Sequence, residues 1–251
     1  MNAKKETVSG SSSLERLVPD DIVAGESTGE TTLDLHIARY EWATAKIEKE
    51  RSVRRILDAA CGVGYGSAIL DSCRLNAEIT GVDIDAAAIS YALERYGASS
   101  IKFIHSDISG LRDHAHFDAI VSLETIEHVA DPVKTISDFW KLLRRGGLFI
   151  MSVPVTPSVD VNPYHLTDFS ASSIRKMLKV AKFEIIDELL QVQPFSPVKI
   201  LSKQESRVED MRDKLLWYYM KNPSAGLKRV YSTLRFGFSN RYLTLACRKL
   251  D

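Results

Sequence analysis

The stretch Leu57-Asp-Ala-Ala-Cys-Gly-Val-Gly-Tyr-Gly-Ser67 decides the fold of this chain of 251 residues. It follows a short apolar run at residues 53–57 that is typical of a strand, and it leads into a run at 67–70 that is typical of the start of a helix. Its three glycines permit a sharp turn and let a ligand approach the backbone, because they carry no Cβ. The first N–H groups of the following helix would point at that ligand. The order strand, glycine turn, helix therefore predicts a nucleotide-binding turn.

The spacing of these glycines argues against a dinucleotide. A dinucleotide fingerprint reads G-x-G-x-x-G, and here Ser67 stands where the third glycine belongs. Asp58, four residues before Gly62, suits a ligand that carries an ammonium group and no pyrophosphate. A turn with a purely structural role is the alternative. The pattern Asp58-x-x-x-Gly62-x-Gly64 resembles motif I of the class I S-adenosylmethionine (SAM) methyltransferases.

Composition indicates one globular α/β domain. Apolar residues make up 45% of the chain, and 33 basic side chains balance 33 acidic ones, so the charge gives no global attraction to nucleic acid or to an anionic membrane. Three cysteines are too few for a disulfide framework, which favours a reducing, cytoplasmic location. The sequence has neither an apolar signal core nor a membrane-spanning run. We expect a disordered polar tail at 1–20 and a single soluble domain at 21–251.

Strands and helices alternate along this domain. After the first strand we expect strands at 79–83, 101–104, 117–122, 148–153, 183–191 and 241–248. Helices are expected at 31–50, from Asp85, at 131–145 and at 170–179, the third of them opened by Asp131-Pro132 and ended by Gly146-Gly147. This alternation predicts a mostly parallel, Rossmann-like sheet with helices on both faces.

A mostly helical insertion is expected at 202–235, before the last strand. It carries Trp217, Tyr218 and Tyr219 together with several lysines and arginines. It is a candidate lid or homodimer surface, and a packing helix with a solvated basic face explains the pattern equally well.

The resemblance to SAM methyltransferases extends over residues 35–192. Motif II corresponds to 81–85, motif III to Asp107-Ile108, motif IV to 117–124 and the post-motif to 142–147. It implies a seven-stranded sheet of order 3-2-1-4-5-7-6 with strand seven antiparallel, and SAM as the cofactor. The implied contacts are Asp83 to the ribose hydroxyls, Asp107 and Ile108 to adenine, and Leu123 to the methionyl end. The full expected set is Arg39, Ala60, Gly62, Asp83, Ile84, Asp107, Ile108 and Leu123.

The leading helix contributes Arg39 to that set. The run His36-Ile-Ala-Arg39-Tyr40 looks like the element that closes over the cofactor in many relatives of this fold, which makes Arg39 or Tyr40 a candidate contact to the methionine carboxylate. Ordinary helix packing is an equally good explanation.

The chemistry is expected just after the fourth strand. If Glu124-Thr-Ile-Glu127-His128 is helical, its two glutamates and its histidine share one face. His165, from the loop after the fifth strand, borders the same crevice. Two carboxylates and two imidazoles suit a divalent ion, with carboxylates favouring magnesium or manganese and imidazoles also accepting zinc. A hydrogen-bonded helix cap is the competing explanation.

Further resemblance narrows the reaction. The Glu-x-x-Glu-His element looks like the one that binds a divalent cation in ubiquinone-pathway O-methyltransferases and small-RNA 2′-O-methyltransferases. Asn162-Pro-Tyr-His165-x-x-x-Phe169-Ser170 is closer to bacterial methyltransferases of sugar and polysaccharide pathways. We therefore expect an O-methyltransferase for a hydroxyl of a small acceptor, a sugar or glycan first, with His128 or His165 as base or metal ligand. A small-RNA methyltransferase and a non-catalytic SAM-binding protein are the alternatives, while Asp58 and Ser67 disfavour a nicotinamide dehydrogenase.

Overall fold

A computed structural model describes residues 27–50, 52–72, 77–97, 100–113, 117–194 and 214–251. The expected tail at 1–20 and the first part of the insertion, 202–213, lie outside these ranges. Seven strands of the described chain form one sheet in the order β3-β2-β1-β4-β5-β7-β6, which confirms the expected order. They are β1 Arg55–Ala59, β2 Glu78–Asp83, β3 Lys102–His105, β4 Phe117–Leu123, β5 Leu143–Pro154, β6 Phe183–Pro194 and β7 Ser239–Lys249.

The sheet is parallel from β3 to β5, and β7 runs antiparallel to both β5 and β6. Asp58 pairs with Gly81 and Val121, so the residues that follow β1, β2 and β4 emerge at one edge of the sheet. The carboxyl ends of parallel strands form the crevice in which such folds bind ligands. The topology therefore places the glycine turn, the residues after β2 and the residues after β4 and β5 at a common edge.

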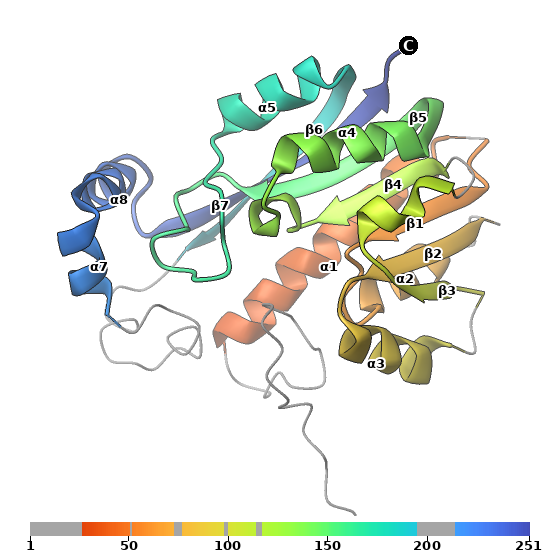
Figure 1. Cartoon of the computed structure of the whole chain (residues 1–251), viewed down its shortest axis with the longest axis horizontal. Helices are drawn as coiled ribbons and strands as arrows, with labels where there is room; N and C mark the ends of the chain where they lie inside the picture. The colour runs from red at the N-terminus through yellow and green to blue at the C-terminus, as the bar shows by residue number, and fades with distance from the viewer. Residues whose placement is uncertain (1–26, 51, 73–76, 98–99, 114–116, 195–213) are drawn as a thin grey trace, which may run out of the picture.

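Helices cover both faces of the sheet and bury a core on each (Figure 1). On one face α4 Pro132–Leu142 and α5 Ala171–Val180 pack against the strands through Phe139 and Ile174. On the other face lie α1 Ser27–Ile47, α2 Tyr65–Ser72 and α3 Ala86–Tyr96, with Tyr40 and Leu70 in the core. The two cores hold the sheet in a sandwich of helices, as the alternating pattern predicts.

The boundary between α4 and β5 differs from the prediction. The helix ends at Leu142 and β5 begins at once with Leu143. The expected end of the helix at 145 and the expected start of the strand at 148 are therefore wrong. Leu143 is fully buried and pairs with Phe117, whereas the next pair along the two strands is Leu148 with Ala119. The four residues between form a bulge in which Gly146 has a φ of +67°. The glycine pair therefore loops out of a strand that has already started.

The described part of the insertion consists of two helices, α7 Leu215–Lys221 and α8 Pro223–Phe236. They stand beside one end of the sheet, between β6 and β7 in the chain (Figure 1). Of the helices in the described residues, none has the length and apolarity to cross a bilayer.

Candidate active site

The glycine turn that follows β1 has the left-handed backbone that its sequence predicts. Ala60, Gly62 and Gly64 have φ values of +60°, +55° and +85°. A Cβ on Gly62 would meet open space, whereas one on Gly64 would come within 2.8 Å of the Ala92 side chain. Gly66 has a different role, because its Cβ would lie 2.0 Å from the ring of Tyr40. Gly62 thus leaves room above the turn, and Gly66 lets α1 pack against α2.

Asp58, at the end of β1, is fully buried below this turn. Its two carboxylate oxygens accept hydrogen bonds from the Tyr40 hydroxyl at 3.1 Å and from the Ser67 hydroxyl at 2.6 Å. Burial raises the pKa of Asp58 to about 6, against the opposing effect of these two hydroxyl donors. Asp58 is therefore a carboxyl group whose pKa lies close to physiological pH, and its position is fixed by hydrogen bonds from α1 and α2.

Asp83, at the end of β2, lies directly beside the turn. Its Oδ2 accepts the N–H of Gly62 at 2.8 Å, and its Oδ1 accepts the N–H of Asp85 at 2.9 Å. Asp85 in turn accepts the N–H groups of Ala87 and Ala88 as the N-cap of α3. The carboxylate of Asp83 is thereby held at the mouth of the turn, where its contact with ribose stays a prediction.

The remaining expected cofactor residues follow β2, β3 and β4. Ile84 is 57% exposed, and Leu123 is buried. Asp107 is exposed and accepts the N–H of Ser109 at 2.6 Å, and these bonds to Ser109 lower its pKa. Ile108 is half-buried against the core. The adenine contacts of Asp107 and Ile108 remain predictions.

Arg39 takes part in a buried network that the sequence did not reveal. Its guanidinium is 1% exposed, donates from Nε to the side chain of Gln191 at 2.7 Å and lies over the ring of Tyr242 at 4.4 Å. Its Nη1 lies 3.3 Å from Oε1 of Glu124 in an ion pair. Glu124 thus compensates the charge that was expected to meet the methionine carboxylate.

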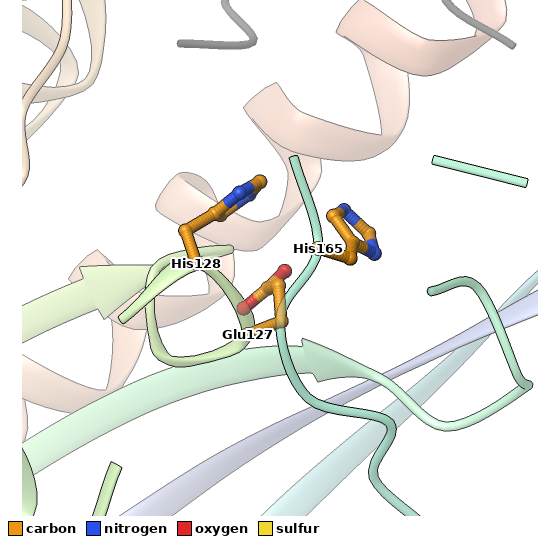
Figure 2. Close-up of side chains that lie close together, drawn as sticks. All are labelled: Glu127, His128 and His165. Carbon is orange, nitrogen blue, oxygen red and sulfur yellow. The ribbon is translucent and has the colours of Figure 1, made fainter. Parts of the chain in front are cut away.

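Glu127, His128 and His165 form a compact cluster (Figure 2). One ligand atom from each lies within 4.8 Å of those of the other two. Glu127 and His128 come from a 3₁₀ turn, Ile126–His128, that follows β4, and His165 comes from the loop after β5. Glu127 is fully buried, and both imidazoles are half-buried. The structure therefore brings together three of the four expected metal ligands.

Glu124 is the fourth expected ligand, and its placement in the same group needs correction. The segment is a single 3₁₀ turn and not a helix, and Glu124 precedes it with a φ of +50°. Its carboxylate accepts the Ser152 hydroxyl at 2.6 Å and pairs with Arg39. The shared helical face on which the prediction depended therefore does not form.

Backbone contacts orient the cluster. Nδ1 of His128 lies 3.1 Å from the carbonyl oxygen of Tyr164, which can only accept, so this nitrogen is the ring's donor. Nδ1 of His165 bonds the Ser158 hydroxyl at 2.7 Å, and the two imidazoles meet edge to face at 4.7 Å. The carbonyl of Glu127 accepts the N–H groups of residues 166 and 167 at 2.8 and 3.2 Å. The turn after β4 and the loop after β5 are thus bonded into one unit.

The insertion holds the same loop from its other side. Arg229 of α8 donates to both oxygens of Asp160 and to the carbonyl of Pro157. The Tyr219 hydroxyl of α7 donates to Asp160 at 2.6 Å, and Asp160 is 4% exposed. No local pattern announces these contacts, because they join residues 59 and 69 positions apart.

Known proteins resemble this chain in both sequence and fold. A family model described as a methyltransferase domain matches residues 57–151. The ubiquinone biosynthesis O-methyltransferase of a Ruegeria species is 33% identical, over 62% of this chain and 68% of that protein. The chain belongs to the class I SAM-dependent methyltransferases.

Further methyltransferases and solved structures are similar to this chain. A probable SAM-dependent methyltransferase of Mycolicibacterium smegmatis is 30% identical over 64% of this chain and 66% of that protein. The chain spans a little under two thirds of the length of this and of a second mycobacterial relative. The YcgJ protein of Bacillus subtilis is 14% identical with a TM-score of 0.61, covering 84% of this chain and 99% of that one, and this likeness concerns the fold.

Proposed function

We propose that this methyltransferase transfers the methyl group of SAM to a hydroxyl of a small acceptor, with a sugar or glycan as the first choice. The observation that carries the proposal is the cluster of Glu127, His128 and His165 at the edge of the sheet that also bears the glycine turn. A hydroxyl needs to lose its proton during transfer, and a buried carboxylate beside two imidazoles is suited to that task.

The cofactor is proposed to lie over the turn at Gly62. Asp83 is fixed there to accept the ribose hydroxyls, and Ile84, Asp107 and Ile108 are the proposed neighbours of adenine. The backbone of Ala60 and the side chain of Leu123 are proposed to line the methionyl end. Arg39 is the proposed contact of the methionine carboxylate, which would have to share its Nη1 with Glu124, the ion-pair partner at 3.3 Å.

His128 is the proposed base. With Nδ1 donating to the Tyr164 carbonyl, Nε2 is the ring nitrogen that can accept a proton. The acceptor oxygen forms its bond to the methyl carbon, the bond from that carbon to sulfur breaks, the hydroxyl proton passes to Nε2, and S-adenosylhomocysteine leaves. Holding the two reactants in line supplies about 7–11 kcal/mol of the barrier reduction for such a transfer.

The donor set also fits a divalent cation. Glu127, His128 and His165 would hold it, and a bound cation would lower the pKa of the acceptor hydroxyl. Because Glu124 lies outside the group, the set has one carboxylate and two imidazoles. This balance favours manganese, iron or zinc over magnesium, which prefers oxygen ligands.

Two features support the choice of acceptor. The loop that carries His165 has the run Asn162-Pro-Tyr-His165, which resembles the corresponding loop of sugar and polysaccharide methyltransferases. The Ruegeria relative carries the description of an O-methyltransferase, which supports oxygen as the methylated atom. A small-RNA acceptor and a protein that binds SAM without turnover remain the alternatives for the assay to separate.

The test is transfer of labelled methyl from SAM to a panel of saccharides, quinols and RNA, with and without EDTA. We expect transfer to a saccharide hydroxyl, and His128→Ala to reduce its rate by about a hundred-fold or more while SAM affinity is kept. Full turnover of His128→Ala would remove that residue from the mechanism. Transfer to RNA alone, or SAM binding without any transfer, would replace the proposal with the corresponding alternative.

The metal is tested separately by calorimetry with Mn²⁺, Zn²⁺ and Mg²⁺. Glu127→Gln should lose affinity for the cation, whereas Glu124→Gln, the matched control outside the cluster, should keep it. Equal loss in both variants would return Glu124 to the site, and absence of binding by the unaltered protein would leave the cluster as an acid–base group.

A further inference from the structure

Helix α8 is amphipathic, but its apolar side is exposed and its polar side faces the body of the protein. Leu227, Val230, Tyr231 and Leu234 recur at the spacing of one helical stripe, and they are 73%, 58%, 61% and 83% exposed. Arg229 and the buried Ser232 lie on the opposite side, toward the body of the protein. A helix that buried its apolar stripe in its own fold would have the reverse arrangement. The stripe is therefore turned toward something outside the described chain.

The adjoining helix α7 adds to this surface. Trp217 and Met220 are 55% and 80% exposed, and they stand three positions apart on one side of the helix. We call the six residues Trp217, Met220, Leu227, Val230, Tyr231 and Leu234 the insertion face. Isolated exposed apolar side chains are common, but six on two contacting helices mark an interaction surface.

The charged side chains of residues 214–238 all have one sign, and two of them, Lys228 and Arg229, are paired with Asp168 and Asp160 of the loop after β5. Residues 214–238 contain five lysines and arginines and no aspartate or glutamate, although the whole chain is neutral. Nζ of Lys221 lies 3.5 Å from the centre of the Trp217 ring, and Arg235 donates to the Tyr231 hydroxyl at 2.8 Å. These two cations therefore border the apolar side chains directly.

The combination of exposed apolar side chains and bordering cations favours an anionic lipid surface over a second copy of the chain as the partner of the insertion face. A symmetric contact with a second copy would place this face against itself, so its cations would face a surface whose own charged side chains are also cations, and like charges in an interface are unfavourable. An anionic lipid surface accepts apolar and aromatic side chains at its acyl boundary and attracts bordering cations. We propose that the insertion face docks this protein onto an anionic bilayer surface, with α8 lying in the plane of the interface.

Docking would have a consequence for the active site. Arg229 of α8 and Tyr219 of α7 both bond Asp160, which belongs to the loop that carries His165. The mouth of the site is thereby tied to the helices that meet the membrane. The inference does not depend on the identity of the acceptor, because vesicle binding is measured without turnover.

The experiment is co-sedimentation of the full chain with vesicles of phosphatidylcholine alone or mixed with phosphatidylglycerol. We expect binding to the mixed vesicles that weakens with salt and is small on phosphatidylcholine. Leu227→Ser with Leu234→Ser should weaken it at least about ten-fold, since each leucine contributes apolar burial. Lys221→Gln with Arg235→Gln should weaken it by about ten-fold or more at low salt.

The matched control is Val133→Ser with Val180→Ser, which changes two valines that are 59% and 74% exposed on other helices. It should bind as the unaltered chain does, and circular dichroism should show all variants folded. Failure to bind mixed vesicles, or undiminished binding by the leucine variant, would overturn the proposal. So would self-association seen by light scattering that the leucine variant loses in the absence of vesicle binding, because the face would then serve a second copy.

Discussion

At the scale of single residues, we expect Asp58 to couple SAM binding to pH. Its pKa of about 6 means that, before SAM binds, the carboxylate is largely protonated at pH ~5 and largely ionised at pH ~7. We expect the ammonium group of SAM to lie near Asp58 and to favour its ionised form, so SAM affinity should rise about ten-fold over this range and level off above it. Calorimetry across these pH values measures the effect, and Asp58→Asn should bind SAM more weakly with no such rise. An affinity of the unaltered protein that is constant with pH would separate Asp58 from the ammonium group.

A second residue-scale prediction concerns Gly66, which lies inside α2. Alanine in a helix is ordinarily more stable than glycine by about 1 kcal/mol, but here its Cβ would overlap the Tyr40 ring at 2.0 Å. Gly66→Ala should therefore reduce the free energy of urea unfolding by about 1–3 kcal/mol. Gly226→Ala in α8 is the control, since its nearest neighbour would be 3.6 Å away, and it should be neutral or stabilising. Equal effects of the two changes would show that the Tyr40 ring can move away from the added Cβ without loss of stability.

These residues also show what sequence reasoning can reach. The turn at Gly62 and the position of Asp83 follow from local spacing, and the structure has both where the pattern places them. The ion pair of Arg39 with Glu124 was out of reach, because it joins α1 to the end of β4. The positive φ of Glu124 was equally hidden, since a non-glycine residue in that conformation depends on its tertiary partners.

At the scale of elements, the insertion and the loop after β5 depend on one carboxylate. Replacing Asp160 by Asn leaves Arg229 without its anionic partner and weakens the bond from Tyr219. Asp160→Asn should lower the free energy of unfolding by about 2 kcal/mol or more, because a mostly buried pair is broken. It should also reduce turnover while SAM affinity is kept, since the loop carries His165.

The matched control for that change is Glu188→Gln, which breaks the exposed pair of Glu188 with Arg175 between β6 and α5. It should alter stability by about 1 kcal/mol at most and leave turnover unchanged. If Asp160→Asn behaves in the same way, the helices of the insertion do not position the loop.

Element boundaries were predictable where a local signal exists. Asp131-Pro132 opens α4 as expected, with the Asp131 side chain accepting the N–H of Lys134. The end of the same helix was missed, because the burial of Leu143 outweighs the Gly-Gly signal three residues later. Long-range pairing with Phe117 therefore decides where β5 begins.

At the scale of the whole molecule, net charge does not show how the charges are distributed over the surface. The neutral total led to the expectation of no global attraction to anionic membranes, yet residues 214–238 hold five of the 33 cations and none of the 33 acids. Their clustering beside exposed apolar side chains is a property of two helices, and a sum over the chain conceals it.

The stability of the whole molecule should show two opposing pH effects. Burial, followed by the charge of Arg39, lowers the pKa of His36 to about 3, so between this value and its ordinary 6.5 the unfolded chain binds more protons. Stability from this group therefore rises with pH over that window. Asp58 has a folded pKa of about 6 against an ordinary 3.8, so the folded chain binds more protons between these values and stability falls as pH rises. The two contributions largely cancel from pH ~4 to pH ~6.

Replacing either group should reveal the pH dependence of stability that the other one contributes. Relative to the unaltered protein, Asp58→Asn should gain about 2–3 kcal/mol in the free energy of urea unfolding as pH rises from ~4 to ~6, because one pKa unit corresponds to about 1.4 kcal/mol. His36→Gln, which removes the partner of the Tyr65 hydroxyl, should lose stability relative to the unaltered protein over the same range. Opposite slopes in the two difference curves are required, because burial disfavours the charged form of each group, which lowers the pKa of His36 and raises the pKa of Asp58. Flat difference curves would mean that neither group changes its pKa on folding, and slopes of the same sign would contradict one of the two shifts.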